Sequence, residues 1–364
     1  MIPSIRSAAL ALFVAMAGVQ AQTIPQSTAN ETSGGGRACN NSPELCGKQY
    51  NAITYMGAHG ASFLRDGSTG NSVSGNQFQN ATAALDAGLR LLQVQVHKSG
   101  STLKLCHTSC SLLDAGSLES WLSVVNGWLS NNPNEVITLV LVNSDEAPAS
   151  DFGPVFETSG IAKVSYNPGT SKATSNWPTL ESMIGQGTRV VSFVTNMPFS
   201  SSTPYLLPEF DFIFETPFEV SDMSGFNCTV DRPTRARPVA TALSKNYMSL
   251  VNHFKYQDVT SSIQVPDVDR IETINSPDTS AEGNLGKHLQ QCATEWNKQP
   301  NFVLVDFWDK ANPLQAADNL NRVSSPVSRK STTSTPSTGG ATNAGKGEYG
   351  ALVSLLTAAT LLLL

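Results

Sequence analysis

The sequence predicts an α/β protein built as a single (β/α)8 TIM barrel. Apolar runs rich in β-branched residues alternate with helix-like segments between residues 38 and 322. Several of these runs are apolar on both faces, as is typical of buried parallel strands. The stretch also has the length of one α/β barrel rather than that of two ordinary domains.

Eight strands are predicted in this region, and most are separated by enough chain for a crossover helix. They cover residues 52–59, 89–97, 102–107, 135–142, 188–194, 211–215, 247–252 and 302–307. Helices are predicted at residues 76–87, which Gly88 ends, and at residues 117–130, whose apolar side chains recur at helical spacing. This order of elements indicates parallel strands surrounded by helices.

Two of the predicted strands end in a histidine, just before a polar loop. His59 ends the first run and His107 ends the third. The carboxyl ends of parallel strands open on one face of a barrel, and active sites are found there. Two imidazoles at that face can act as a base and an acid near neutral pH. Either histidine could instead be a structural residue whose hydrogen bonds are satisfied within the fold.

Side-chain alternation along the second strand predicts a polar cavity. Gln93, Gln95 and His97 share one face, while apolar residues dominate the other. These three side chains are therefore expected to line a substrate pocket, although the two glutamines could equally form a hydrogen-bonded layer of the core. Arg90 should face away from the cavity by the same alternation, so we expect it to have a structural role.

The amino terminus predicts export. Residues 1–21 carry Arg6, an apolar stretch and a small-x-small triplet that ends at Ala21, which together indicate a signal peptide. A flexible lead-in rich in glycine, serine and threonine follows over residues 22–37, before the barrel domain of residues 38–322. The mature chain is therefore expected to begin near Gln22 and to fold outside the cytosol.

The carboxyl terminus predicts a glycosylphosphatidylinositol (GPI) anchor. Residues 351–364 contain no charge, and a short polar spacer and a group of small residues precede them. The expected attachment residue is Asn343, with Gly340 as the alternative, so that residues 344–364 form a removed propeptide. A tail-anchored helix is the competing interpretation, but the run is shorter than the ~20 residues that cross a bilayer.

These signals place the protein on the extracellular face of the plasma membrane or in the cell wall. Residues 323–343 contain a low-complexity run of serine and threonine and are predicted to form an extended stalk. The net charge is −6 and 14% of the residues are charged, without a basic stripe, so nucleic acid is not expected as a partner. The chain is expected to act as a monomer.

The cysteines and the glycosylation sequons agree with export. An even number of cysteines in a secreted chain predicts disulfides, although six cysteines allow many pairings. Sequence proximity favours two short bridges and leaves one long one: Cys39–Cys46, Cys106–Cys110 and Cys228–Cys292. A metal site at the second cysteine pair lacks a further pair of ligands at zinc-site spacing. Four asparagines in sequons are expected at the surface as glycan sites: Asn30, Asn40, Asn80 and Asn227.

Six short motifs in order link the chain to a known family. They are found at residues 57–59, 85–92, 105–107, 176–180, 250–252 and 301–307. With them the chain resembles the phosphatidylinositol-specific phospholipase C X-domain superfamily, in particular its secreted eukaryotic branch of phospholipase C (PLC)-like phosphodiesterases. The resemblance implies an irregular TIM barrel in which His59 is the general base and His107 the general acid. Asp306, on the last strand, is expected at the pocket as the residue that orients one imidazole.

The chain departs from this family where positive charge is expected. Metal-independent members carry an Asp and an Arg on the second strand, and calcium-dependent members carry acidic ligands there and an Asn after the first histidine. This chain has Gln93, Gln95 and Gly60 at those places. No cofactor or metal is therefore expected; calcium stays open as an alternative, although its usual ligands are not evident. Activity should be weak, and Gln95→Arg should raise it if the backbone matches the metal-independent relatives.

Two classes of function follow from these observations. The first is a GPI-anchored extracellular phosphodiesterase that cleaves an inositol phospholipid or a related phosphodiester. The second is a catalytically weak or inactive barrel that serves as a cell-surface or cell-wall binding module. A glycosidase on the same barrel would need a pair of carboxylates at strand ends, for which Glu215 and Asp306 are the candidates.

Overall fold

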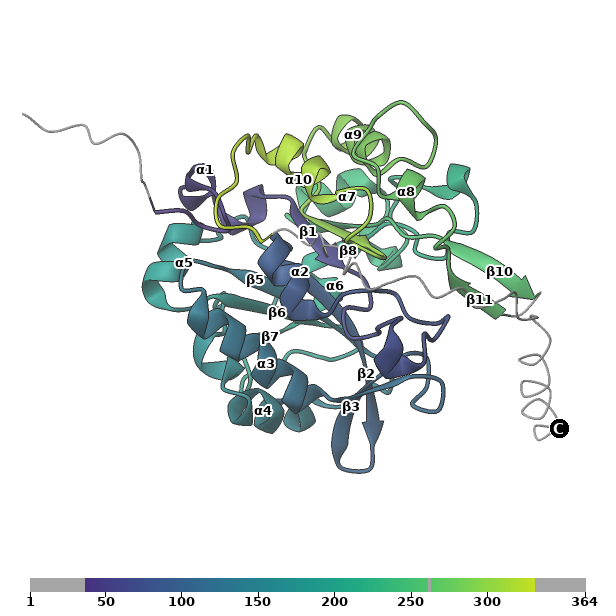
Figure 1. Cartoon of the computed structure of the whole chain (residues 1–364). Coiled ribbons are helices and arrows are strands. Elements are labelled where there is room, and N and C mark those ends of the chain that lie inside the picture. Colours follow the sequence, from purple (N-terminus) through teal and green to yellow (C-terminus); the bar gives the residue numbers. More distant parts are fainter. Residues whose placement is uncertain (1–36, 261–262, 331–364) are drawn as a thin grey trace, which may run out of the picture. The chain divides into compact units, whose positions relative to one another are not determined.

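Eight parallel strands lie side by side in one curled sheet (Figure 1). The computed structural model describes residues 37–260 and 263–330, which belong to one compact unit. The strands follow the order β7, β6, β5, β2, β1, β12, β9 and β8. Their bounds are β1 Tyr55–Ala58, β2 Leu91–Ser99, β5 Ile137–Asn143, β6 Val190–Val194, β7 Leu206–Pro208, β8 Ile213–Glu215, β9 Met248–Asn252 and β12 Phe302–Val305.

The barrel is irregular because the sheet stays open between β7 and β8. Within the described residues, β7 pairs only with β6 and β8 pairs only with β9. A single turn of helix, α6 (Glu209–Phe212), joins these two edge strands. The predicted class, an irregular TIM barrel, is confirmed.

Seven of the eight predicted strands are barrel strands, and one is not. The predicted strand at residues 102–107 is β3 (Thr102–Cys106), which pairs antiparallel with β2 and with β4 (Asp114–Ser117). The eighth barrel strand is β7, for which no prediction was made. β7 has three residues and ends in proline, so it is too short to show an alternating pattern.

The β2–β3 hairpin changes the path to His107. β2 continues beyond the sheet to Ser99, and the chain turns back at Gly100, which has a φ of +63°. β3 therefore runs back toward the barrel, antiparallel to β2. His107, which follows β3, reaches the carboxyl end of the sheet from the direction opposite to that of the barrel strands. The sequence-based assumption that both histidines end equivalent barrel strands is wrong, although both reach the same face.

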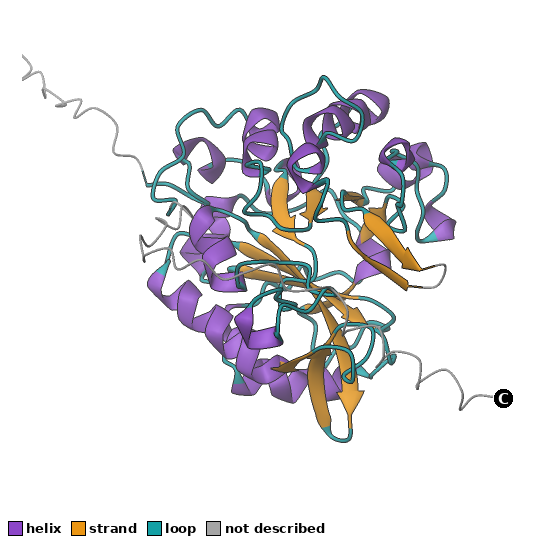
Figure 2. Cartoon of the chain, turned by 45° about the vertical axis from the view of Figure 1, so that its right-hand side comes forward, coloured by secondary structure: helices purple, strands orange, loops and turns teal. Residues whose placement is uncertain are grey.

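Helices cover the outer side of the sheet (Figure 2). The longest, α3 (Leu118–Asn131), is capped by the Ser117 side chain and buries one apolar stripe against the sheet. α2 (Ala81–Ala87) is capped by Asn80 and ends at Gly88, which has a φ of +115°. The other α-helices are α1 Pro43–Cys46, α4 Ala149–Thr158, α5 Leu180–Gln186, α7 Val239–Ser244, α8 Ile271–Ile274, α9 Leu285–Trp296 and α10 Leu314–Asn321. Among the described residues, every helix is too short or too polar to cross a bilayer.

The barrel interior is apolar at one end and polar at the other. Tyr55, Leu91 and Phe302 belong to one buried apolar cluster, and each is the first residue of its strand. Further along β2, the inward positions are Gln93 and Gln95, which line a cavity instead. The alternation predicted along β2 is therefore present, and the apolar layer beneath forms the floor of the polar end.

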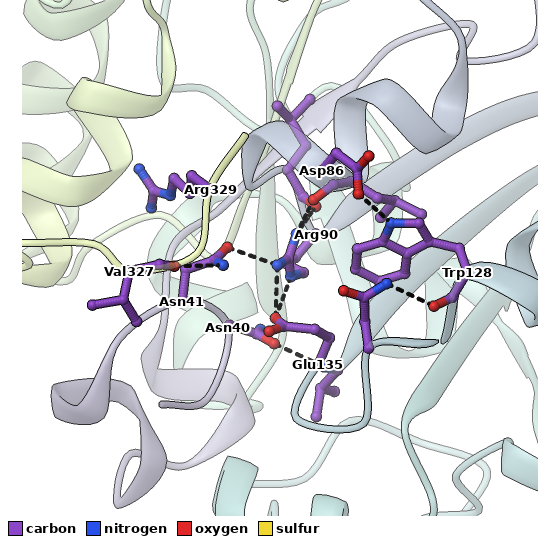
Figure 3. Close-up of polar contacts among 12 residues, drawn as sticks. Asn40, Asn41, Asp86, Arg90, Trp128, Glu135, Val327 and Arg329 are labelled. Atoms are coloured by element: carbon purple, nitrogen blue, oxygen red, sulfur yellow. Dashed lines mark hydrogen bonds and ion pairs between the residues drawn. The ribbon is translucent and has the colours of Figure 1, made fainter. Parts of the chain in front are cut away.

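Arg90 belongs to a buried ion-pair network below the sheet (Figure 3). Its guanidinium lies 2.7 Å from Glu135 and donates to Asn41 and to two backbone carbonyls, each at 2.7 Å. The guanidinium also lies 5.2 Å from the ring centroid of Trp128. Arg90 is thus far from the carboxyl ends of the strands, in agreement with the structural role that alternation indicated.

Residues 323–330, the start of the predicted stalk, pack against the domain. Val327 exchanges hydrogen bonds with Asn41 (Figure 3). Arg329 makes a bidentate ion pair with Asp318. Lys330 bonds to Asp86 at the end of α2 through its backbone and its side chain. The predicted signal peptide, most of the lead-in, Asn30 and Asn343 lie outside the described residues.

The three disulfides are present with the pairing that sequence proximity favours. Of the sequon asparagines, Asn80 is exposed and Asn227 is half-buried. Asn40, in contrast, is only 5% exposed, because its side-chain carbonyl accepts a hydrogen bond from the Val136 N–H at the start of β5. The expectation that Asn40 lies at the surface as a glycan site is therefore wrong.

Candidate active site

His59 and His107 line one cavity at the carboxyl ends of the strands. The cavity has a volume of about 220 Å³. Its lining combines the two histidines with amide, aromatic and acidic side chains: His59, Gly60, Phe63, Asn76, Gln93, Gln95, His107, Thr108, Phe218, Glu219, Tyr256 and Gln264. Two of the lining segments lie 48 residues apart in the chain, at His59 and His107, and the β2–β3 hairpin brings them together.

His59 is held by a buried carboxylate. β1 and β12 are neighbours with Ala58 opposite Val305, so the next residues, His59 and Asp306, lie side by side. His59 Nδ1 is 2.8 Å from Asp306 Oδ1, and Asp306 is 2% exposed. Because a carboxylate oxygen only accepts, Nδ1 is the donor of this hydrogen bond, and among the described residues Nε2 has no hydrogen-bond partner. Asp306 therefore lies behind His59.

An aromatic ring fixes the plane of His59. Phe254, which follows β9 and is 2% exposed, stacks on the imidazole with 3.7 Å between ring centroids and an interplanar angle of 1°. Asn76 donates to the same Asp306 oxygen at 3.0 Å. The His59 ring thus has its hydrogen bond and its orientation set before any ligand arrives.

His107 is placed by its loop rather than by a strand. The Cys106–Cys110 disulfide closes that loop, and the His107 N–H donates to the Leu113 carbonyl at 3.0 Å. The Phe63 ring meets the imidazole edge to face, with 4.9 Å between centroids. Burial, together with the nearby His59, lowers the pKa of His107 to about 4. His107 is therefore neutral at pH 7 in the free protein.

The two predicted pocket glutamines are both in the cavity lining, and His97 is not. His97 Nδ1 lies 3.1 Å from Asp145, outside the residues that form the cavity. The physical reason is that β2 runs past the sheet into the hairpin, so at His97 the strand has left the barrel mouth. The prediction that His97 lines the substrate pocket is wrong.

A second cavity of about 120 Å³ adjoins the first and contains residues that the sequence did not reveal. It shares His59, Gln93 and Gln95 with the first cavity and adds Arg232 and Asn252. Arg232 precedes a proline in a long loop, so neither a strand nor a motif marks it in the sequence. Glu215, at the end of β8, and Asn252, in the motif at residues 250–252, did carry a signal in the sequence.

Arg232, Glu215 and Asn252 form one polar group in this second cavity. Arg232 Nε donates to Glu215 Oε2 at 2.8 Å, and Asn252 Nδ2 donates to the same oxygen at 3.1 Å. Burial opposes ionisation of Glu215, but Arg232 lowers the pKa of its carboxyl below the usual value. Burial and the charge of Glu215 raise the pKa of Glu209 well above the usual value, so Glu209 is neutral.

The described residues show no ready metal centre in this region. Two groups bring three potential ligands together, and both contain the two sulfurs of a disulfide: Cys228, His288 and Cys292, and Cys106, Cys110 and Asp114. Sulfurs bonded to each other are not available as thiolate ligands. Glu215 is already engaged by Arg232.

Comparison with known proteins identifies the family. A family model described as PI-PLC X 1 matches residues 45–321, which include both histidines and Asp306. The chain belongs to the PI-PLC X family. A PI-PLC X domain-containing protein 1 of Arthroderma benhamiae is 35% identical over 285 residues, which cover 78% of this chain and 89% of that protein.

The chain is also similar to a second fungal protein and to a solved structure. A protein of Arthroderma benhamiae described as an uncharacterized secreted protein is 35% identical over 295 residues, covering 79% of this chain and 64% of that protein. Among solved structures, the phosphatidylinositol-specific phospholipase C from Listeria monocytogenes has a TM-score of 0.50 at 16% identity. The match covers 76% of this chain and 94% of that one, and it concerns the fold.

Proposed function

We propose that this PI-PLC X protein is an extracellular phosphodiesterase that cleaves an inositol phospholipid or a related phosphodiester. One observation carries the proposal: His59 and His107 line the same cavity, and a buried carboxylate holds His59 with its Nε2 free. This is the arrangement that concerted general base and general acid catalysis needs. The secreted relative supports an extracellular location.

The proposed reaction begins with His59. Its Nε2 takes the proton from a substrate hydroxyl next to the phosphodiester, and that oxygen attacks phosphorus to form a cyclic phosphate. The bond from phosphorus to the glycerol oxygen breaks, and His107 gives this oxygen a proton. Asp306 stabilises the imidazolium that His59 becomes. The two histidines thus exchange their protonation states, and a return of protons through water completes the cycle.

His107 must be protonated to act as the acid, and bound substrate can favour this protonation by raising the pKa of His107. In the free protein its pKa is lowered to about 4. A phosphodiester anion between the two imidazoles favours the charged form of His107 and so raises its pKa. Acid catalysis then depends on bound substrate, which fits a slow enzyme.

The second cavity fits a head group rich in hydroxyls. Glu215 is an ionised acceptor, and Asn252 and Arg232 are donors, all next to His59 and the two glutamines. Alternating donors and acceptors suit the hydroxyls of a polyol ring. Because Arg232 is paired with Glu215, it contributes little net charge toward a phosphate.

The proposal is tested by assaying the purified protein on a panel of phosphodiesters, with ³¹P NMR to detect a cyclic phosphate. His59→Ala and His107→Ala should each lower kcat by about 10²–10⁴-fold. His97→Ala is the matched control and should retain activity, because His97 pairs with Asp145 outside the cavity. Equal activity in all three variants, or loss in the control alone, would contradict the assignment.

A binding module is the second candidate. It is favoured by the neutral state of His107 in the free protein and by the glutamines at the places where charged relatives hold the phosphate. If the protein is a binding module, it should turn over no phosphodiester of the panel. A ligand that carries the head group of one of these phosphodiesters should bind saturably and shift the His59 NMR signals.

A further inference from the structure

The two glutamines of β2 each bond to the backbone next to one catalytic histidine. Gln93 Oε1 accepts a hydrogen bond from the N–H of Gly60, the residue after His59, at 2.7 Å. Gln95 Oε1 accepts one from the N–H of Thr108, the residue after His107, at 2.8 Å. The two contacts are equivalent although β1 runs parallel and β3 antiparallel to β2, along the edge of β2 that β5 does not occupy.

These bonds decide how each amide is oriented. A backbone N–H only donates, so the oxygen of each glutamine side chain must face it, and the NH₂ group must point the other way. Among the described residues, neither Nε2 has a hydrogen-bond partner, and both side chains line the cavity between the histidines. Each glutamine therefore has two N–H donors available to a ligand.

The spacing along β2 matches the ligand that the histidines would hold. Residues two apart on one strand are separated by about 6.6 Å, since the rise is about 3.3 Å per residue. That is the span of a phosphate group with a hydrogen bond on each side. β2 thus acts as a fixed spacer between the segments that carry the base and the acid.

We infer that Gln93 and Gln95 are positioning residues: each Oε1 holds the segment of one histidine, and each NH₂ group is aimed at the non-bridging oxygens of a bound phosphate. The second half of this inference rests on the proposed function, and the first half does not. Neutral donors bind a phosphate more weakly than an arginine does. The two Oε1 hydrogen bonds, to the N–H groups of Gly60 and Thr108, form a clamp that holds the segments of both histidines.

The inference reverses the sequence-based expectation for Gln95→Arg. Arginine has no acceptor atom, so it cannot receive the hydrogen bond from Thr108. The substitution would add a positive charge to the cavity, but it would also remove the hydrogen bond that holds the loop of His107. The variant should therefore be less active than the wild type, and a gain in activity would overturn the inference.

The clamp is tested by hydrogen exchange of individual backbone amides, measured by NMR on the full-length folded protein. Gln93→Met should speed exchange at Gly60 roughly tenfold and leave Thr108 unchanged, and Gln95→Met should do the reverse. Gln93→Glu and Gln95→Glu keep an acceptor and should preserve protection. Gln291→Met is the matched control, because Gln291 is exposed on α9, bonds to Glu295 and lies outside the cavity lining.

The donor half is tested by NMR titration of the same variants with inorganic phosphate. All four substitutions should weaken phosphate binding by about tenfold, while Gln291→Met should not. Unchanged exchange at Gly60 and Thr108 in the methionine variants would overturn the clamp, and undetectable phosphate binding by the wild type would overturn the donor role. Exchange requires no turnover, so a protein with the clamp but without phosphodiesterase activity would disprove the proposed function alone.

Discussion

At the scale of single residues, the two histidines are prepared differently. His59 has a carboxylate at 2.8 Å and an aromatic ring on its face, which favour its role as a base. His107 meets the edge of Phe63 and a loop backbone, and burial lowers its pKa. The two imidazoles therefore meet different surroundings, as two groups that divide the roles of base and acid would need.

The lowered pKa of His107 predicts a loss of stability in mild acid. In the folded state this group stays neutral down to about pH 4, whereas in the unfolded chain it binds a proton near pH 6.5. The unfolded state therefore holds more protons between these values, and the free energy of unfolding falls as the pH drops from 6.5 to 4. Urea unfolding across this range should show a flatter pH dependence in His107→Gln.

A direct titration checks the same prediction. The His107 imidazole signals in NMR should shift with a midpoint near pH 4 in the free protein. With inorganic phosphate bound, the midpoint should move upward, because the anion favours the charged ring. A midpoint of 6.5 or higher without ligand would show that the ring is not desolvated as the structure has it.

At the scale of elements, regular alternation was predictable and irregular connections were not. Long strands such as β2 and β5 carry enough residues for their pattern to show, and the polar face of β2 correctly indicated Gln93 and Gln95. β7 is too short for such a pattern. An alternating pattern also carries no information on strand direction, so the sequence does not distinguish β3, an antiparallel hairpin strand, from a barrel strand. Alternation also does not show where β2 leaves the sheet, and for this reason the prediction that His97 lines the pocket is wrong.

The loop that carries His107 gives a prediction for its disulfide. Replacing Cys106 and Cys110 with serine opens a ring of five residues and should lower the free energy of unfolding by about 2 kcal/mol. Because this ring holds the acid, phosphodiesterase activity should also fall, and amide exchange at Thr108 should become faster.

The long disulfide is the matched control for that change. Replacing Cys228 and Cys292, which are 64 residues apart, should cost more stability, about 4 kcal/mol, because the closed loop is longer. At a temperature where both variants are folded, it should spare the exchange rate at Thr108. Equal effects of the two changes on Thr108 would contradict a local role for the Cys106–Cys110 bridge.

At the scale of the whole molecule, the sequence was sufficient for the fold class and for the family. Six motifs in order and one domain-sized run of strands and helices agreed with the family match to residues 45–321. Contacts between distant segments could not be read in this way. The Arg232–Glu215 pair and the stack of Phe254 on His59 depend on how loops cross in three dimensions.

The chain ends predict a processed, lipid-linked protein. Mass spectrometry of the mature protein should find an amino terminus near Gln22 and a carboxyl-terminal glycolipid at Asn343. The protein should partition into detergent and leave that phase after treatment that cleaves GPI anchors. A retained Leu364 would disprove the anchor, and Asn343→Gln with Gly340 intact would show which residue is used.

The segment of residues 323–330 has a consequence for how the molecule faces its surroundings. It passes Asn41 and ends at Asp86, where α2 leads into the amino end of β2. His59 and His107 open at the carboxyl ends of the strands, on the opposite side of the sheet. Lys330, the last described residue, therefore lies at the back of the barrel. A surface that held the protein close to Lys330 would face the back of the molecule, and the mouth would open away from that surface.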